Sequence, residues 1–221
     1  MFRHLSALSC AAFFGFVSVT VADDATEPGF VALFDGETLR GWNGDDRWFR
    51  VVDGVIVAGS ESEPIPHNYF LCTDETFGDF ELRLDIKLIG EGENAGVQFR
   101  SRREAGSTEV IGYQADAGRA WDRWVWGALY DESRRRRMLA EPDHEQLKGL
   151  VRPDDWNQMT VIARGPQIEI RLNGETTVTF EETEEVAKRG VIGLQIHSGP
   201  PTRALYRNVR LRRLGSDAGE R

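Results

Sequence analysis

Residues 79–88 read DFELRLDIKL, a stretch in which polar and apolar side chains alternate without a break. Because successive side chains of a β-strand point to opposite faces, this alternation predicts a strand with one buried face. The residues expected on the buried face are Phe80, Leu82, Leu84, Ile86 and Leu88, and those expected on the outer face are Glu81, Arg83, Asp85 and Lys87. The same period of two recurs through most of the chain after residue 30.

Two dipeptides predict tight turns between neighbouring strands. Asp53-Gly54 separates FRVV from VIV, and Asn173-Gly174 separates IEIRL from ETTVTF. Both dipeptides favour type I′ turns, in which the two central residues need positive φ. A further strand pair, MTVIARG and QIEIRL, is joined through Gly165-Pro166, and RNVRLRRL supplies a closing strand. Only residues 141–151 suggest a short helix, so the sequence predicts an all-β domain of two packed antiparallel sheets.

Length and charge narrow the class of protein. A chain of 221 residues fits one domain with a substantial core. Its 36 acidic residues outnumber its 27 lysines and arginines, which makes the chain a poor candidate for binding nucleic acid. The basic run Arg134–Arg137 is interpreted as a solvated turn.

The N-terminus has the features of a secretory signal. Residues 1–22 carry Arg3, an apolar run from Leu5 to Val21 and a small residue at Ala22. We expect cleavage near Ala22 and a periplasmic or secreted protein with no membrane span after the signal is removed. A membrane anchor is the weaker interpretation because the run is short for a bilayer, and lipidation at Cys10 is a minor alternative. Cys72 would then be the only cysteine, so no internal disulfide is expected.

Three predicted strands each carry two polar residues in the two-residue step that places them on one face. The pairs are Gln98 with Arg100, Gln114 with Asp116, and Gln195 with His197. Polar alternation is also what an ordinary solvent-facing strand shows. These strands nevertheless use glutamine and histidine where a plain outer face uses lysine and glutamate. The set combines amides, a carboxylate, a guanidinium and an imidazole, which is a mixture that suits a sugar pocket.

Three tryptophans lie within six residues, at Trp121, Trp124 and Trp126, in a segment that also contains Gly118 and Gly127. An aromatic cluster is most often part of a core. The glycine-rich and aspartate-rich setting instead favours a loop, with at least one tryptophan on the rim of a pocket, where it stacks on the apolar face of a sugar.

An ordered set of short motifs resembles the family of 3-keto-disaccharide hydrolase domains. The match covers about residues 29–214, which we interpret as one domain. Its pieces are LFDGETLRGW from Leu33 to Trp42, Trp48, Asp53 to Ile56, Gly96 to Arg100, Gly112-Tyr113, Gly127 to Tyr130, Trp156-Asn157, Asn173-Gly174, Gly193 to Gln195, His197 and Tyr206 to Asn208. The resemblance implies a two-sheet antiparallel jelly-roll sandwich of the concanavalin A-like lectin and glucanase type. Many members have Glu after the Gly-Tyr pair and Gln two residues later, where this chain has Gln114 and Asp116.

The resemblance also implies a reaction. The substrate is a glycoside already oxidised to a ketone at C3, which acidifies the hydrogen on C2. A base removes that proton and the C1 substituent leaves, with or without later addition of water. His197 or Asp116 is the expected base, Arg100 the enolate stabiliser, and Tyr130 or Tyr113 the proton donor. A divalent cation held by His197 and Asp116 is an alternative electrophile, although no cofactor is predicted with certainty. A partner oxidoreductase would supply the oxidised sugar.

The remaining predicted site residues are assigned to substrate binding. They are Gln98, Tyr113, Gln114, Gln195, Trp121, Trp124 and Trp126. The competing interpretation is a lectin-like envelope module that binds glycans without chemistry, because this architecture hosts both lectins and enzymes. An ordinary glycosidase would need a pair of carboxylates on facing strands, and the sequence offers no convincing pair.

Overall fold

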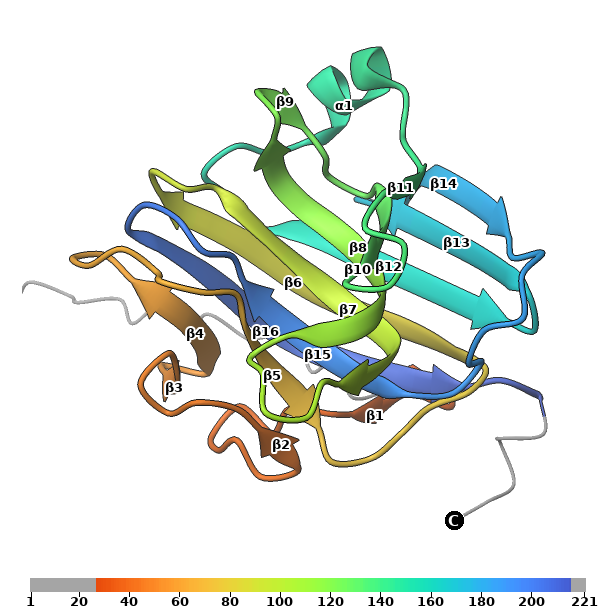
Figure 1. The fold of residues 1–221 in the computed structure, drawn as a ribbon, viewed down its shortest axis with the longest axis horizontal. Coiled ribbons are helices and arrows are strands. Elements are labelled where there is room, and N and C mark those ends of the chain that lie inside the picture. Colours follow the sequence, from red (N-terminus) through yellow and green to blue (C-terminus); the bar gives the residue numbers. More distant parts are fainter. Residues whose placement is uncertain (1–26, 216–221) are drawn as a thin grey trace, which may run out of the picture.

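The computed structural model describes residues 27–215, which form two antiparallel sheets packed face to face (Figure 1). The β6 sheet has the strand order β14-β13-β12-β6-β16-β4-β3, with β1 beside β16. Its strands are β1 (Val31–Ala32), β3 (Phe49–Val52), β4 (Val55–Ser60), β6 (Phe80–Gly90), β12 (Asn157–Arg164), β13 (Gln167–Leu172), β14 (Glu175–Glu181) and β16 (Thr202–Arg213). The predicted signal segment, residues 1–22, lies outside the described residues.

The second sheet is the β8 sheet. Its order is β11-β10-β8-β7-β15-β5-β2, with β9 beside β8. Its strands are β2 (Trp42–Asn43), β5 (Tyr69–Thr73), β7 (Asn94–Arg103), β8 (Val110–Ala120), β9 (Arg123–Trp124), β10 (Leu129–Glu132), β11 (Met138–Ala140) and β15 (Val191–Ile196). Some neighbours in this sheet are far apart in sequence, since β15 pairs with both β5 and β7. The predicted all-β sandwich is therefore confirmed.

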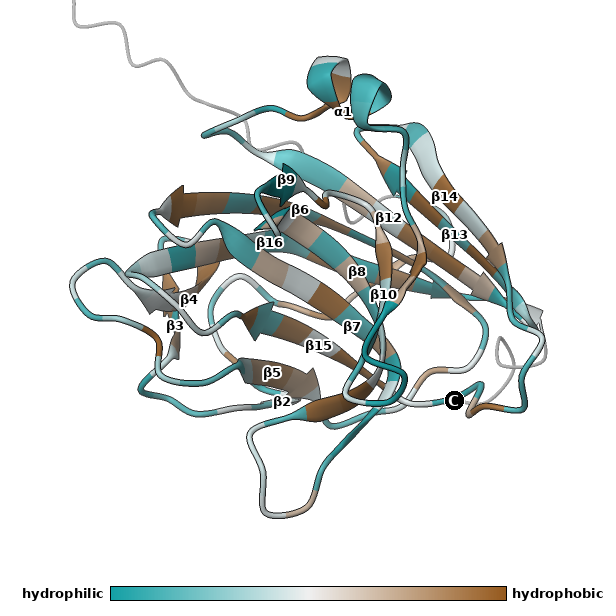
Figure 2. Ribbon diagram, turned by 45° about the horizontal axis from the view of Figure 1, so that its top comes forward, coloured by the Kyte–Doolittle hydropathy of each residue, from teal (hydrophilic) through white to brown (hydrophobic). Residues whose placement is uncertain are grey.

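The alternating stretch 79–88 forms most of β6, in the middle of its sheet. The four side chains of Phe80, Leu82, Leu84 and Ile86 are fully buried. They pack against the inner face of the β8 sheet in one continuous core, which includes Val97 and Leu194. Figure 2 shows the alternation as bands of hydrophobic and hydrophilic residues along the strands. The predicted inward face is confirmed. On the other face Arg83, Asp85 and Lys87 are partly exposed, whereas Glu81 is buried against Arg83 and Arg212.

Both predicted hairpins are present. Asp53 and Gly54 have φ of 49° and 76° between β3 and β4, as a type I′ turn needs. Asn173 and Gly174 have φ of 51° and 92° between β13 and β14. The Asn173 amide also donates to the Leu150 carbonyl oxygen at 2.8 Å, which ties this turn to helix α1 (His144–Leu150). That helix is the one predicted near 141–151. None of the helices in the described part of the chain is both long and apolar enough to cross a bilayer.

The interpretation of Arg134–Arg137 as a solvated turn is wrong for its first two members. Arg134 contacts the buried Asp131 at 2.9 Å, and Arg135 contacts Glu182 at 2.6 Å. Burial opposes ionisation of Glu182, but hydrogen bonds from Arg135 and Tyr113 lower its pKa to about 2. Two buried carboxylates therefore hold this turn against the edge of the sandwich. The sequence did not reveal these pairs, because Glu182 is distant along the chain and the burial of Asp131 depends on tertiary packing.

Candidate active site

The outer face of the β8 sheet gathers most of the predicted polar pairs. Strand register sets Gln98 of β7 opposite Gln114 of β8, and Gln114 opposite Tyr130 of β10. One step along, Gly96 of β7 lies between Gln195 of β15 and Asp116 of β8. Because these positions are separated by even steps, their side chains share the face opposite the core.

A cleft of about 280 Å³ lies over this face. Strands β7, β8 and β10 contribute Asn94, Gln114, Asp116, Ala120, Tyr130 and Glu132, and the surrounding turns add Asn68, Trp121 and His197. Asp116, His197 and Tyr130, which were predicted as catalytic, therefore come together in one cavity. Its lining is mostly polar, with amides, carboxylates, a phenol and an imidazole facing the same space.

Asp116 lies in the wall of this cleft and is only 7% exposed. Its Oδ1 accepts a hydrogen bond of 2.8 Å from Gln114 Nε2. Burial raises the pKa of Asp116 to about 8; the Gln114 hydrogen bond opposes this rise, and the carboxylates of Glu132 and Glu141 add to it. A carboxyl that titrates near neutral pH can accept a proton as a strong base and return it as an acid.

His197 follows the end of β15 and is partly exposed in the cleft. Its Nδ1 lies 2.6 Å from the Ser198 carbonyl oxygen. A carbonyl oxygen only accepts, so Nδ1 carries the hydrogen, and the neutral ring presents Nε2 as an acceptor. His197 thus offers the cleft a hydrogen-bond acceptor at Nε2.

Tyr130 and Glu132 enter the cleft from β10. Burial and the nearby Glu132 and Asp116 carboxylates raise the pKa of the Tyr130 hydroxyl, so it stays protonated and can donate. Burial and the Glu109 carboxylate raise the pKa of Glu132. Sequence reasoning missed Glu132, although the two-residue step from Tyr130 was available as a signal. It also missed Asn94, which continues the Gln98 face of β7, and Asn68, for which the loop gave no signal.

The prediction that Arg100 shares this face is wrong. The pairing of β7 with β8 shifts register between Phe99 and Arg102, and Arg100 has a φ of 47°. This bulge turns the Arg100 side chain away from the cleft. Its guanidinium donates to the carbonyl oxygens of Gly78 at 2.9 Å and Gly165 at 2.7 Å, and it also contacts Asp79. Arg100 therefore clamps two loops of the sandwich and is not placed to stabilise an enolate in the cleft.

Tyr113 also lies outside the cleft, which corrects its predicted role in binding or proton donation. It is one residue from Gln114, so strand alternation turns it into the core. Its ring stacks on Phe99 at 5.4 Å, and its hydroxyl donates to Glu182.

Two of the predicted glutamines are too deep to line the cleft. Gln98 and Gln195 are both fully buried. The Gln98 amide contacts its neighbours Gln114 and Ser101. Neither polar atom of the Gln195 side chain has a hydrogen-bond partner among residues 27–215. Among the three glutamines, only Gln114 lines the cleft.

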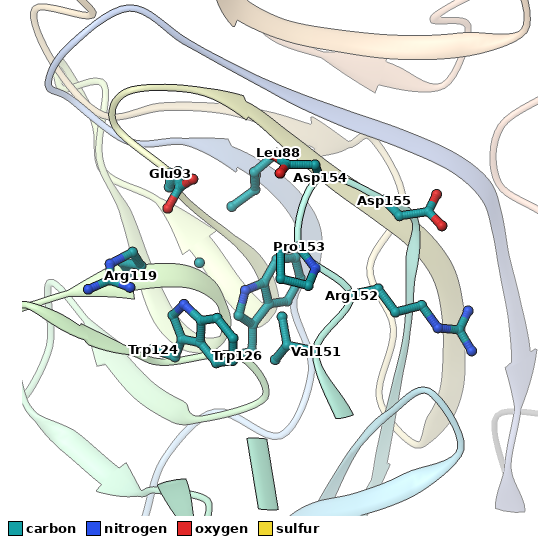
Figure 3. A pocket seen from close by; sticks show the side chains of 11 residues that line it. Leu88, Glu93, Arg119, Trp124, Trp126, Val151, Arg152, Pro153, Asp154 and Asp155 are labelled. Carbon is teal, nitrogen blue, oxygen red and sulfur yellow. The ribbon is translucent and has the colours of Figure 1, made fainter. Parts of the chain in front are cut away.

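The three tryptophans separate into different environments. Trp121 is 63% exposed at the tip of the β8–β9 turn and lines the cleft. Its ring lies 6.3 Å from that of Tyr130, with the Arg123 guanidinium 5.2 Å from the ring centroid. Trp126 is buried, and Trp124 packs against the same core. Figure 3 shows these two rings beside Val151 and Pro153, in a separate cavity of about 40 Å³. Trp121 therefore has the predicted rim position of at least one tryptophan, whereas Trp124 and Trp126, which are also assigned to substrate binding, lie outside the cleft.

The predicted cation alternative rests on Asp116 and His197. Within residues 27–215, no group of three or more His, Cys, Asp and Glu side chains is arranged to hold a metal ion. Two candidate ligands do not define a metal centre.

Comparison of structures places this sandwich in the concanavalin A-like jelly-roll class. A candidate glycosyl hydrolase from Parabacteroides distasonis ATCC 8503 superposes with a TM-score of 0.64 at 20% identity, over 85% of this chain and 94% of that one. The β-glucanase of Bacillus licheniformis gives 0.55 at 9% identity, over 84% and 97%. The carbohydrate binding module CBM66 of Bacillus subtilis gives 0.56 at 17% identity, over 78% and 95%.

Residues 29–212 match the model of the 3-keto-alpha-glucoside-1,2-lyase-like domain. The chain belongs to this family, as its motifs predict, and is a carbohydrate-active module. No curated protein shows significant similarity to it.

Trp121 and Trp126 should respond oppositely to replacement by alanine. Trp121→Ala removes an exposed ring, so the fold should survive while binding of a glucoside probe weakens. Trp126→Ala empties a buried site and should cost about 3–5 kcal/mol of unfolding free energy. Urea denaturation and calorimetric titration measure the two effects. Equal destabilisation by both variants, with binding unchanged, would show that the cluster is purely structural.

Asp116→Asn should stabilise the protein increasingly as the pH rises. The folded chain holds this proton up to about pH 8, whereas an unfolded aspartate releases it near its ordinary value of 3.8. Stability is therefore lost as the pH rises through that window and is constant above it. The variant has no such loss, so it should gain about 1.4 kcal/mol on the wild type for each pH unit between pH 4 and pH 8.

Denaturation midpoints measured across this pH range test the expectation. Asp122→Asn is the matched control because Asp122 is an exposed carboxyl at the tip of the β8–β9 turn. A constant difference between wild type and Asp116→Asn across the range would show that the Asp116 carboxyl is not buried as described.

Proposed function

We propose that the protein cleaves 3-keto-glycosides by removing the C2 proton and eliminating the C1 substituent. The observation that carries the proposal is the meeting of Asp116, Tyr130 and His197 in one cleft, with Asp116 held in a buried wall that raises its pKa to about 8. Family membership supports the substrate class. Removal of the C2 proton needs a strong base. A carboxylate with a raised pKa is a stronger base than an exposed carboxylate with an ordinary pKa.

The chemistry follows from the ketone at C3. Asp116 takes the C2 proton, and the electron pair of the C2–H bond forms an enolate with its charge on the C3 oxygen. That pair then forms the C1–C2 double bond as the C1–O bond breaks and the leaving oxygen takes a proton from the Tyr130 hydroxyl. Water then adds across the double bond: its oxygen bonds to C1, its proton returns to the Tyr130 oxygen, and C2 regains a proton from Asp116, which gives net hydrolysis. His197 accepts a hydrogen bond from a substrate hydroxyl at Nε2 and orients the ring.

Charge balance explains how such a cleft can work without Arg100. None of the described residues lining it is Arg or Lys. When the proton moves from C2 to Asp116, negative charge leaves the carboxylate as it appears on the enolate oxygen, so the net charge of the cleft does not change. Neutral donors, among them the amides of Asn68 and Asn94, then face the enolate.

The alternative is a glycan-binding module without chemistry. The exposed ring of Trp121 on the rim favours it, because such a ring can stack on a sugar whether or not a bond is broken. Under either alternative, we propose that residues 1–22 direct export to the periplasm or the medium. Under the enzymatic one, a separate sugar oxidoreductase supplies the ketone.

The reaction is tested by incubating the protein with a 3-keto-glucoside and, separately, with the unoxidised parent glucoside. Release of the aglycone is expected only from the 3-keto compound. Asp116→Asn should lower that rate by about 10²–10⁴, which is the usual contribution of a general base. Asp122→Asn again serves as the control, since it makes the same chemical change on the exposed turn and should keep the wild-type rate.

Three results would change the proposal. Equal cleavage of the parent glucoside would contradict elimination through a ketone. Binding of either sugar without cleavage would favour the glycan-binding module. Loss of the activity on treatment with a chelator, and its return with a divalent cation, would assign the electrophilic role to a metal ion.

A further inference from the structure

A chain of hydrogen bonds runs along the outer face of the β8 sheet and ends on Asp116. Ser101 Oγ lies 2.8 Å from Gln98 Oε1, Gln98 Nε2 lies 2.8 Å from Gln114 Oε1, and Gln114 Nε2 lies 2.8 Å from Asp116 Oδ1. In this arrangement every donor points toward the carboxylate. Ser101, Gln98 and Gln114 are each at most 3% exposed, so water does not compete for these bonds.

Glycines on neighbouring strands leave the space that the side chains of Ser101, Gln98 and Gln114 occupy. A Cβ atom on Gly96 would lie 2.5 Å from Gln114 Cδ, and one on Gly112 would lie 2.2 Å from Ser101 Oγ. A Cβ on Gly193 would lie 3.2 Å from Gln98 Cβ. Each of the three polar side chains therefore packs against a glycine, and a larger residue at that glycine would push the side chain aside. These hydrogen-bonded side chains therefore lie close against the backbone of the sheet.

The residues at the two ends of this hydrogen-bonded series allow the donor-to-acceptor direction of every bond in it to reverse. Ser101 Oγ lies 2.8 Å from both the Phe99 carbonyl oxygen and Gln98 Oε1, and 3.5 Å from the Tyr113 carbonyl oxygen, so its single hydrogen has alternative acceptors. If Asp116 is protonated, its hydroxyl can donate to Gln114 Oε1 after both amides turn over. Gln114 then donates to Gln98, Gln98 donates to Ser101, and Ser101 donates to Phe99. Every member stays hydrogen-bonded in both directions.

We propose that Ser101, Gln98 and Gln114 form a reversible positioning relay that holds the Asp116 carboxyl in one orientation in both of its protonation states. None of the described residues donates a hydrogen bond to Asp116 Oδ2, so this oxygen is left for a group in the cleft. The catalytic part of this inference rests on the proposed function, in which Asp116 must first accept a proton and later release it. A base held by a fixed donor alone would lose its partner in one of the two states.

Other ionisable groups around Asp116 must be separated from the relay. Tyr130 and Glu132 face it from β10, His197 from the end of β15, and Glu141 from the segment after β11. Strand β7 contributes the neutral side chains of Asn94, Gln98 and Ser101 beside the relay, while its Arg103 donates to the Phe70 carbonyl oxygen at 3.1 Å farther along the sheet. These charged groups act electrostatically on Asp116 itself. The relay instead passes a change in the protonation of Asp116 on to Gln98, which does not contact Asp116.

The relay is tested by nuclear magnetic resonance of isotope-labelled protein without any substrate. The Asp116 carboxyl carbon and the glutamine side-chain amides are followed from about pH 6 to about pH 10, a range that spans the titration. The amides of Gln114 and Gln98 should shift with the same midpoint as Asp116. Gln195 is the matched control, because it is an equally buried glutamine on the same sheet but makes none of these hydrogen bonds.

Variants sharpen the test. Gln114→Met should raise the Asp116 midpoint by roughly 0.5–1 pH unit, because a donor to the ionised form is lost, and should abolish the titration of Gln98. Gln195→Met should leave the Asp116 midpoint unchanged. If Gln114→Met does not fold, Ser101→Ala applies the same test from the other end, where removal of the hydroxyl should diminish the response of Gln98.

Either of two results would overturn the relay: a Gln98 amide that does not respond while Asp116 titrates, or a Gln195 amide that responds as strongly as Gln98. Once turnover is measured, Gln98→Met should shift the pH profile of kcat while KM changes less than twofold. Because the resonance experiment needs no substrate, failure of the proposed reaction would leave the structural relay standing, and failure of the relay would leave the reaction open.

Discussion

The pairing of β7 with β8 is the constraint on which the site depends. Once Gln98 lies opposite Gln114 and Gly96 opposite Asp116, the two-residue alternation of a strand leaves each side chain only two destinations. Tyr113, Ala115 and Ala117 enter the core between the sheets, while Gln114 and Asp116 enter the cleft. The packing that stabilises the sandwich therefore also places a carboxyl where loops cover it and water has little access.

Much of the fold could be predicted because its signals are local. A β-strand shows its two faces in consecutive residues, as in 79–88, and a type I′ turn shows its need for positive φ in dipeptides such as Asn173-Gly174. The gathering of Gln114, Asp116, Tyr130 and His197 on one side of the sheet followed from the same period of two and from the family motifs. Glu132 carried that signal as well and was overlooked.

The sequence-based predictions are wrong where the local pattern no longer determines which way a side chain points. Arg100 reads as a continuation of the Gln98 face, but a bulge inserted after Phe99 turns it to the opposite side, and no feature of GVQFRSR announces that bulge. The tryptophans show the same limit, because their fates depend on which loops pack over them: Val151 and Pro153 cover Trp124 and Trp126, while Trp121 is carried outward at a turn. The burial of Asp116, and hence its raised pKa, likewise depends on tertiary contacts alone.

The role of Asp116 as the base that removes the C2 proton is tested most directly by the fate of that hydrogen. A 3-keto-glucoside carrying deuterium at C2 is turned over in ordinary water, and the sugar product is analysed by mass spectrometry beside a sample incubated with Asp116→Asn. Elimination predicts that the wild-type product has lost the deuterium, while substrate recovered with the variant retains it. Product that keeps its deuterium at C2 and forms as fast as product from the unlabelled substrate would contradict the mechanism, since the C1–O bond would then have broken without removal of the C2 hydrogen; retention with a slowed rate would instead show that Asp116 returns the same deuterium.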